Sequence, residues 1–333
     1  MHVLVTGGAG FIGSHLARYH FDRGDIVHVV DNLSTGSLDN IKSMFGSPRF
    51  RFDEADVLTW DGLGNAVGWA DRIYHMAAIV GVKKVLADPA AVMSANMAGT
   101  ERVVRAMRKG GWNPQLVIAS SSEVYGFNEK ASFSETDEVL LRSSGRLRWC
   151  YAVTKLADEY LGYAYAHEYD LHIVIVRLFN TIGPRQVGQY GMVVPNFIRQ
   201  AVSNEPITVF GDGTQTRSFC DVRDTVVALD LLASAPEAKG QVVNVGSDQE
   251  ISIKHLAELV MQRAESSSQL QFMSYEEAYG IDFEDVSHRR PDLTKLISLT
   301  GFQPKWKLAD TIDDLIQRAR AHEQKTTLDT MTG

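Results

Sequence analysis

Tyr151 and Lys155 have the residue types and the spacing of a proton-transfer pair. In the segment YAVTK they stand four residues apart, which places both side chains on one face of a helix. A free phenol has a pKa near 10, and a neighbouring ammonium group together with a positively charged ring lowers that pKa toward the working pH. The pair could then take the proton of an alcohol while a hydride leaves. The alternative is two side chains that merely share a helix face.

Residues 120–126, SSSEVYG, are a second candidate because they follow a run that predicts a strand. Open α/β sheets bind their ligands at the carboxyl ends of their strands. The hydroxyl of Ser121 could hydrogen-bond the alcohol that Tyr151 deprotonates, with Ser122 and Glu123 beside it. The alternative is ordinary turn chemistry for the serines and a solvated loop position for Glu123.

A glycine-rich segment, VTGGAGFIGSHLA, places Gly7, Gly10 and Gly13 where a predicted strand meets a predicted helix. One glycine permits a tight turn, one lets the backbone approach a pyrophosphate and one lets the helix pack on the strand. The helix N-terminus near Phe11 then faces the phosphates. Asp31 closes the next predicted strand about 20 residues later, where a carboxylate can bind ribose hydroxyls. This context favours a dinucleotide site over a ligand-free turn, and the acid favours NAD over NADP.

Composition restricts the class of protein. The 333 residues carry 41 acidic and 33 basic side chains, a net charge of −8, and 44% are hydrophobic, as in a folded globular protein. The acidic balance argues against nucleic acid as a partner. No apolar run reaches the roughly 18 residues of a membrane span, and the N-terminus is interpreted as a strand, not a signal peptide. Cys150 and Cys220 form neither a CxxC pair nor a disulfide framework, which favours a cytoplasmic protein without a metal site.

Short β-branched runs alternate with amphipathic segments in the first half of the chain. Strands are expected at residues 2–6, 26–31, 72–78, 115–122 and 171–179. Helices are expected between them, at 11–22, 90–109 and 149–168. Nearly continuous apolar runs suit strands that are buried on both faces. The pattern therefore predicts an α/β fold with a Rossmann-type, doubly wound parallel sheet.

Regularity falls after residue 179. Residues 180–220 and 266–300 are expected to be irregular apart from a strand at 207–211, with helices at 222–235, 252–265 and 308–321. We therefore expect an NAD-binding domain at 1–178, which includes the helix of Tyr151. A smaller α/β substrate lobe at 179–322, interleaved with the sheet, and a polar, frayed tail at 323–333 would follow.

Together these segments resemble the extended short-chain dehydrogenases that modify nucleotide sugars. The resemblance covers nearly the whole chain and includes HMAA (75–78), NMAGT (96–100), RLFNTIGPR (177–185), GMVVPNFI (191–198) and ITVFGDGTQTRSFCDVRD (207–224). It implies a tightly held NAD, a sugar diphosphonucleoside in the C-terminal lobe, and a homodimer formed through two long helices of each subunit.

The resemblance also implies binding residues. Those expected to contact NAD are Gly7, Gly10, Phe11, Ile12, Gly13, Asp31, Asn32, Asp56, Val57, Ala77, Ala78, Asn96, Tyr151 and Lys155. Those expected to contact the nucleotide sugar are Asn180, Arg185, Val194, Arg217 and Arg289. In the family the position of Arg217 binds the diphosphate, and the loop of His75 lines the cofactor without supplying the base. The alternative for Arg185 and Arg217 is surface charge, and for Cys150 it is packing.

Members of this family first oxidise the sugar C4 hydroxyl to a ketone and then differ. Epimerases return the hydride to the other face, 4,6-dehydratases remove a C5 proton and the C6 hydroxyl, and uronate decarboxylases lose carbon dioxide. Glu123 is typical of dehydratases and decarboxylases, whereas Ser122 departs from the aspartate of dTDP-glucose dehydratases. The segment EDVSHRRPDLTKL (284–296) resembles that of uronate decarboxylases, where an arginine at the position of Arg289 faces the substrate carboxylate. The alternative is that Arg289 and Arg290 hold the diphosphate.

These features favour decarboxylation of UDP-glucuronate to a UDP-4-keto-pentose or UDP-xylose. Tyr151 is expected to be the base, with Lys155 as its electrostatic partner. Ser121 would anchor the sugar hydroxyl, and Ser122 and Glu123 would lie near C5 and C6. Arg289 would contact the substrate carboxylate. The alternative is a 4-epimerase acting on UDP-glucose or UDP-glucuronate. A 4,6-dehydratase and a non-catalytic NAD-binding regulator are less favoured.

Overall fold

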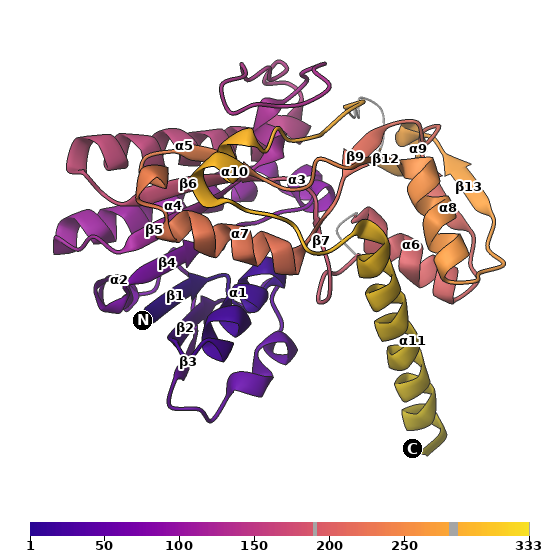
Figure 1. The fold of residues 1–333 in the computed structure, drawn as a ribbon, viewed down its shortest axis with the longest axis horizontal. Helices are drawn as coiled ribbons and strands as arrows, with labels where there is room; N and C mark the ends of the chain where they lie inside the picture. Colours follow the sequence, from indigo (N-terminus) through magenta and orange to yellow (C-terminus); the bar gives the residue numbers. More distant parts are fainter. Residues whose placement is uncertain (189–191, 280–285, 333) are drawn as a thin grey trace.

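Seven parallel strands form the centre of the fold, in the order β3-β2-β1-β4-β5-β6-β11 (Figure 1). The computed structural model describes residues 1–188, 192–279 and 286–332. The first residue of GMVVPNFI and the first two of EDVSHRRPDLTKL lie outside these ranges. The strands are β1 (His2–Thr6), β2 (Ile26–Asp31), β3 (Phe50–Glu54), β4 (Arg72–His75), β5 (Gln115–Ser121), β6 (Ile173–Leu178) and β11 (Val242–Val245). The chain order reverses between β1 and β4, which is where open sheets of this kind bind ligands.

Helices cover both faces of the sheet, which explains the nearly continuous apolar runs of its strands. On β1, Val3 and Val5 pack into the core on one face and Leu4 into the core on the other, and all three are fully buried. The first face is covered by α1 (Phe11–Asp22), α7 (Val222–Ser234) and α10 (Thr294–Thr300). The second is covered by α2 (Leu63–Trp69), α4 (Pro89–Gly110) and α5 (Cys150–Tyr169). The predicted α/β class with a doubly wound parallel sheet is confirmed.

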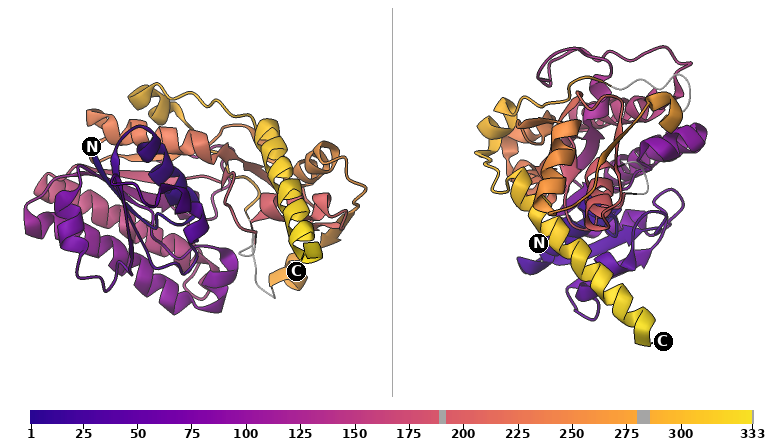
Figure 2. Two further views of the ribbon diagram at one scale, coloured as in Figure 1. Left: turned by 90° about the horizontal axis from the view of Figure 1, so that it is seen from below. Right: turned by 90° about the vertical axis from the view of Figure 1, so that its right-hand side faces the viewer.

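The C-terminal lobe lies beside the sheet (Figure 2). It has an apolar core of its own. Its helices are α6 (Val193–Val202), α8 (Ile253–Arg263) and α11 (Leu308–Thr332). Its strands are β8 (Ile207–Phe210) paired with β13 (Leu270–Met273), and β9 (Thr216–Ser218) paired with β12 (Glu250–Ser252). Between these segments the chain returns to the sheet with α7, β11 and α10. No described helix combines the length and the apolar character that a membrane span requires.

Short connecting elements complete the fold. They are α3 (Val82–Ala87), β7 (Thr181–Ile182), β10 (Cys220–Asp221) and α9 (Tyr275–Tyr279). The parallel pair β7–β10 lies where the chain passes from the sheet into the lobe. This pair places the segment after β6 beside the start of α7.

The sequence expectations miss the edge strands β3 and β11, which are short, and helix α6 in a segment expected to be irregular. Pro195 lies in the first turn of α6, where its missing N–H costs no helix hydrogen bond. The tail was expected to be frayed from residue 323, but α11 continues to Thr332. Good helix formers such as Glu323 and Leu328, with no glycine or proline among them, account for this continuation.

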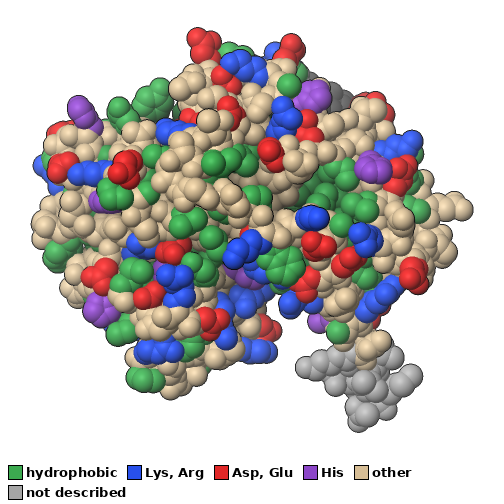
Figure 3. All heavy atoms as spheres, in the orientation of Figure 1, with side chains coloured by type: hydrophobic (Ala, Val, Ile, Leu, Met, Phe, Trp, Pro, Cys, Tyr) green, Lys and Arg blue, Asp and Glu red, His purple; other side chains and the backbone are tan. Residues whose placement is uncertain are grey.

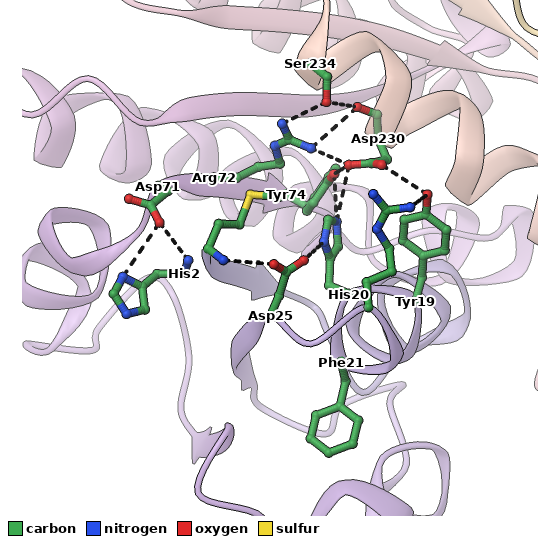
Figure 4. A network of polar contacts seen from close by, with 12 residues as sticks. His2, Tyr19, His20, Phe21, Asp25, Asp71, Arg72, Tyr74, Asp230 and Ser234 are labelled. Carbon is green, nitrogen blue, oxygen red and sulfur yellow. Dashed lines mark hydrogen bonds and ion pairs between the residues drawn. The ribbon is translucent and has the colours of Figure 1, made fainter.

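A buried polar network joins α1, β4 and α7 at the amino end of the sheet (Figure 4). His20 lies at its centre: Nδ1 is 2.8 Å from Asp25 Oδ2, and Nε2 is 3.0 Å from the hydroxyl of Tyr74. Arg72 forms a buried ion pair with Asp230 of α7. Burial lowers the pKa of His20, against the opposing effect of Asp25, and so favours the neutral form of its side chain in the folded protein.

Acidification from about pH 6.5 is therefore expected to destabilise the fold. Burial lowers the pKa of five histidines among the described residues, to about 3 for His75 and about 4 for His15. Such a histidine, with an unfolded pKa of 6.5, takes up its proton only on unfolding as the pH falls toward its folded pKa. The free energy of unfolding then decreases by about 1.4 kcal/mol per pH unit for each fully shifted histidine.

Urea unfolding between neutral pH and about pH 5 measures this slope. Replacing His20 by glutamine should make the slope shallower, because one proton uptake on unfolding is removed. His255 on α8, whose side chain is 68% exposed, provides the matched control, since His255→Gln should leave the slope as it is. Equal slopes in the wild type and in His20→Gln would contradict the assignment of His20 as a neutral buried group.

Candidate active site

A cavity of about 870 Å³ runs along the carboxyl ends of the central strands and into the C-terminal lobe. On the face drawn in Figure 3 the surface is hollowed between these two parts, with acidic and basic side chains interspersed around the hollow. Every residue assigned above to catalysis, to NAD or to the nucleotide sugar lines this cavity, with the exception of Arg185. The fold therefore brings together residues that come from both halves of the chain.

The glycine loop between β1 and α1 forms a cradle that side chains would fill. Gly7 has a φ of +67°, and a Cβ built on it would lie 2.7 Å from the backbone nitrogen of Ala77. A Cβ on Gly13 would lie 2.1 Å from the carbonyl oxygen of Gly7. Both distances are too short for real atoms, so the close approach of the loop to the segment after β4 and to α1 requires glycine. The cradle fits the pyrophosphate of NAD at the start of α1.

Asp31 ends β2 and holds this loop through its carboxylate. Oδ2 accepts a hydrogen bond from the backbone N–H of Ala9 at 2.9 Å, and Oδ1 accepts one from Leu33 at 2.8 Å. The side-chain amide of Asn32 donates to Oδ2 of Asp56 at 3.0 Å. The Asp31 carboxylate thus lies fixed in the cavity wall, with lone pairs left for ribose hydroxyls, which fits NAD.

Asn96 of α4 stabilises another part of the cavity wall through hydrogen bonds. Its side-chain oxygen accepts from the backbone N–H of Ile79 at 2.8 Å, and its amide nitrogen donates to Thr154 Oγ1 at 3.3 Å. His75 lies nearby with Nδ1 2.7 Å from Thr6 Oγ1. Burial and the charge of Lys155 lower the pKa of His75 to about 3, so His75 is a neutral wall residue and a weak base.

Tyr151 and Lys155 both reach the cavity from the first turns of α5. Burial raises the pKa of Tyr151, the carboxylates of Glu123 and Asp158 raise it further, and a hydrogen bond with Ser121 lowers it. Nζ of Lys155 donates to Oδ2 of Asp158 at 3.0 Å, in a buried ion pair. Burial and the two carboxylates outweigh the hydrogen bond with Ser121, so the chain's own groups hold the pKa of the Tyr151 phenol above its ordinary value.

Glu123 lies between two arginines in the wall of the cavity. Its Oε1 accepts from Nη1 of Arg289 at 2.5 Å, and its Oε2 accepts from Nη1 of Arg148 at 3.1 Å. Burial raises the pKa of Glu123, but the guanidinium groups of Arg289 and Arg148 outweigh burial and lower the pKa to about 2. Glu123 is therefore a carboxylate at working pH, not a solvated loop acid and not a proton donor.

The remaining predicted residues divide between the cavity and the scaffold. The amide of Asn180 donates to the carbonyl of Ser218 at 3.1 Å, and both Val194 and Arg217 line the cavity. Arg185 is instead directed to α1, where Nη1 donates to Ser14 Oγ at 3.1 Å. Its φ of +70°, in the left-handed region, belongs to the turn that gives the side chain this direction. The expectation that Arg185 contacts substrate is thus not supported by its position.

Two functional candidates, Arg148 and Asp158, were missed by the sequence reasoning. Arg148 stands three residues before Tyr151 in RWCYAVTK, so the sequence places it just before the helix that carries Tyr151. Asp158 stands three residues after Lys155, a spacing that places the two side chains together on a helix. Within the described ranges, no group of three or more histidine, cysteine or acidic side chains could hold a metal ion.

The parallel sheet, the glycine cradle at the reversal of strand order and the tyrosine–lysine helix define an NAD-dependent enzyme of the short-chain dehydrogenase kind. The chain belongs to the NAD dependent epimerase/dehydratase family, which it matches over residues 3–246. The expected family and the expected cofactor, NAD, are thereby confirmed.

Individual relatives and one solved structure show which proteins of this family the chain is similar to. The chain is 36% identical to a UDP-N-acetyl-alpha-D-glucosaminuronate decarboxylase of Bacillus cytotoxicus, over 96% of this chain and 98% of the relative. It is 34% identical to UDP-glucuronic acid decarboxylase 2 of Arabidopsis thaliana, over 96% of this chain and 68% of that protein. Among solved structures, the UDP-glucuronic acid 4-epimerase of Bacillus cereus, in complex with UDP-glucuronic acid and NAD, is similar with a TM-score of 0.83, 28% identity, and coverage of 96% and 99%.

Proposed function

We propose that the protein decarboxylates UDP-glucuronate through a 4-keto intermediate, in an NAD-dependent reaction. The observation that carries the proposal is the 2.5 Å contact between Arg289 and Glu123 in the wall of the cavity that Tyr151 also lines. Arg148 contacts the same carboxylate, and the charge of Arg217 also acts on it. Guanidinium groups in the wall of the cavity suit a ligand that carries a sugar carboxylate in addition to its diphosphate. The names of the Bacillus cytotoxicus and Arabidopsis relatives support the same reaction.

The residues of the chain account for the first proton transfer and for the binding of the substrate carboxylate. NAD, when bound, supplies the acceptor for the hydride of the C4–H bond. Tyr151 takes the proton of the C4 hydroxyl, which Ser121 orients by a hydrogen bond. The C5–C6 bond of the resulting β-keto acid then breaks as carbon dioxide leaves, and its electron pair passes toward the C4 carbonyl to form an enolate. Water supplies the proton that adds to C5 of this enolate and restores the C4 ketone. Arg289 orients the departing carboxylate, while Ser122 and Glu123 lie on the C5 and C6 side.

We assign the other cavity residues by their position. The glycine loop with Asp31, and the further NAD residues named from the sequence, would hold the dinucleotide on the domain at 1–178. Asn180, Val194 and Arg217 would hold the nucleotide sugar against the lobe at 179–322. Lys155 would contact the ribose of NAD that is attached to the nicotinamide ring. Arg289 lines the cavity and Arg290 is not among its lining residues, which favours the carboxylate role of Arg289 over a diphosphate clamp made by both.

A 4-epimerase is the second candidate, because the Bacillus cereus structure is named for that activity on UDP-glucuronic acid. The two reactions share the oxidation step and differ in the mass of the product. Purified protein should be incubated with UDP-glucuronate and NAD, and the products read by mass spectrometry and proton NMR. Loss of carbon dioxide, giving UDP-xylose or its 4-ketone, is the expected result. A product of unchanged mass would replace the decarboxylase with the epimerase.

We also propose a homodimer in a cytoplasmic location. The adjacent helices α4 and α5 expose Met97, Val153 and Tyr160, which are 41%, 37% and 72% accessible. Apolar side chains gathered on two long neighbouring helices suit burial against a second copy of the chain. Light scattering of the purified protein tests the dimer.

The cytoplasmic location is supported by the cysteines. Cys150 and Cys220 are free thiols, which suits a reducing compartment.

A further inference from the structure

Helix α5 carries an acid on the same face as its two predicted catalytic residues. Tyr151, Lys155 and Asp158 stand at positions i, i+4 and i+7, which is one stripe along the helix. Asp158 has no accessible surface, and its Oδ2 accepts a hydrogen bond from Nζ of Lys155 at 3.0 Å. Its Oδ1 is buried without a hydrogen-bond partner among the described residues. A carboxylate buried in this way is costly unless a cation balances it.

The neighbouring acid on α5 serves another contact. Glu159 accepts from Ser120 Oγ at 2.5 Å and forms two hydrogen bonds with Arg177 of β6. Asp158 is thus paired with Lys155, while Glu159 is paired with Arg177. The two adjacent carboxylates hold two different cations, one at the cavity and one in the scaffold.

The groups around this stripe come from several elements. Glu123 follows β5, Arg148 precedes α5, His75 ends β4 and is neutral, and α4 contributes the uncharged Asn96. Glu123 is balanced by its own two arginines. Asp158 therefore balances the charge of Lys155, while Glu123 has partners of its own.

We propose that Asp158 is a positioning residue, which anchors the ammonium group of Lys155 to α5 and keeps the hydroxyl of Tyr151 protonated in the absence of an additional positive charge. Asp158 does not line the cavity, whereas Lys155 and Tyr151 do, so it acts through them and not on a ligand directly. Its carboxylate cancels the charge that would otherwise favour the phenolate. Deprotonation of Tyr151 then depends on the positive charge that NAD brings to the cavity.

The direction of the effect follows from the charges. Asp158 raises the pKa of Tyr151, as do burial and Glu123. Asparagine at this position keeps the size of the side chain and an oxygen acceptor for Lys155, but it removes the negative charge. The ammonium group then acts on the phenol uncompensated, which favours the phenolate.

The test is the ionisation of Tyr151, followed by ultraviolet absorbance in the NAD-bound protein without sugar. Subtracting the titration of each protein's own Tyr151→Phe variant isolates this phenol. Asp158→Asn should lower the midpoint by about one pH unit, a tenfold change in the ionisation constant. Asp158→Glu, which restores the charge, should return the midpoint toward the wild-type value. Because no sugar is present, this result is independent of whether the decarboxylase proposal holds.

Asp230→Asn is the matched control, since Asp230 is a buried carboxylate of an ion pair at the opposite end of the sheet. It should lower the melting temperature without moving the phenol midpoint. A folded Asp158→Asn protein with an unchanged midpoint would overturn the proposal and leave Asp158 with a structural role alone. If Asp158→Asn does not fold, Lys155→Met provides the second test. It should raise the midpoint, because Asp158 is then uncompensated, and an unchanged midpoint would equally overturn the proposal.

Discussion

Replacing Tyr151 by phenylalanine should reduce turnover of UDP-glucuronate by about 10³-fold or more while leaving the fold intact. The phenol is the group of the described cavity that can take the C4 proton. His75 is neutral with a pKa of about 3, and Glu123 is an ionised carboxylate held by two arginines. Neither can replace the phenol, so the loss should appear in kcat with little change in KM. Steady-state kinetics with product detection by mass spectrometry gives both constants.

Tyr165 offers a matched control on the same helix. It lies 14 residues beyond Tyr151, about 21 Å along the axis of α5, and packs beside Tyr169 in the core on that face of the sheet. Tyr165→Phe should retain full turnover. If Tyr151→Phe retained activity as well, the base would have to be sought elsewhere and the decarboxylase mechanism above would fail at its first step.

The sequence predicts the central sheet well because the evidence for it is local. Runs such as 2–6 and 115–122 carry apolar residues at successive positions. This pattern is typical of a strand that is covered on both faces of its sheet. Both faces of the central sheet are covered by helices. The glycine spacing likewise predicts a close approach, which the φ of Gly7 and the contact that a Cβ on Gly13 would make both show. These features depend on a few neighbouring residues.

Features that depend on distant residues escape such reasoning. Glu123 and Arg289 are 166 positions apart, and only a family resemblance suggested that both belong to one site. Arg185 belongs to a motif that resembles the family, and the motif does not indicate that the side chain contacts Ser14 of α1. Asp158 was overlooked because an acid on a helix is normally interpreted as solvent-exposed, and its complete burial follows from the packing of α5 on the sheet.

The strongest discrimination between the candidate reactions should come from the pair Glu123 and Arg289. Replacing Arg289 by glutamine removes one partner of a buried charge pair, which costs about 2–5 kcal/mol, or about 30- to 4,000-fold in kcat/KM for UDP-glucuronate. Oxidation of UDP-glucose at C4, measured as the reduction of NAD, should change far less, since that sugar has no carboxylate for Arg289 to hold. Glu123→Gln should produce a similar loss with UDP-glucuronate, because Arg289 and Arg148 are then left without the carboxylate that aligns them.

A double-mutant cycle separates a shared role from two independent ones. If the contact orients the substrate carboxylate, Glu123→Gln combined with Arg289→Gln should lose little more activity than either change alone, a coupling well above 1 kcal/mol. The exposed pair Arg263 and Asp313, whose side chains are 43% and 39% accessible, is the matched control and should show almost no coupling. An equal loss with UDP-glucuronate and UDP-glucose would contradict the carboxylate role. Arg289 would then act on the diphosphate, which both substrates share. The contact between Arg289 and Glu123 would no longer support decarboxylation.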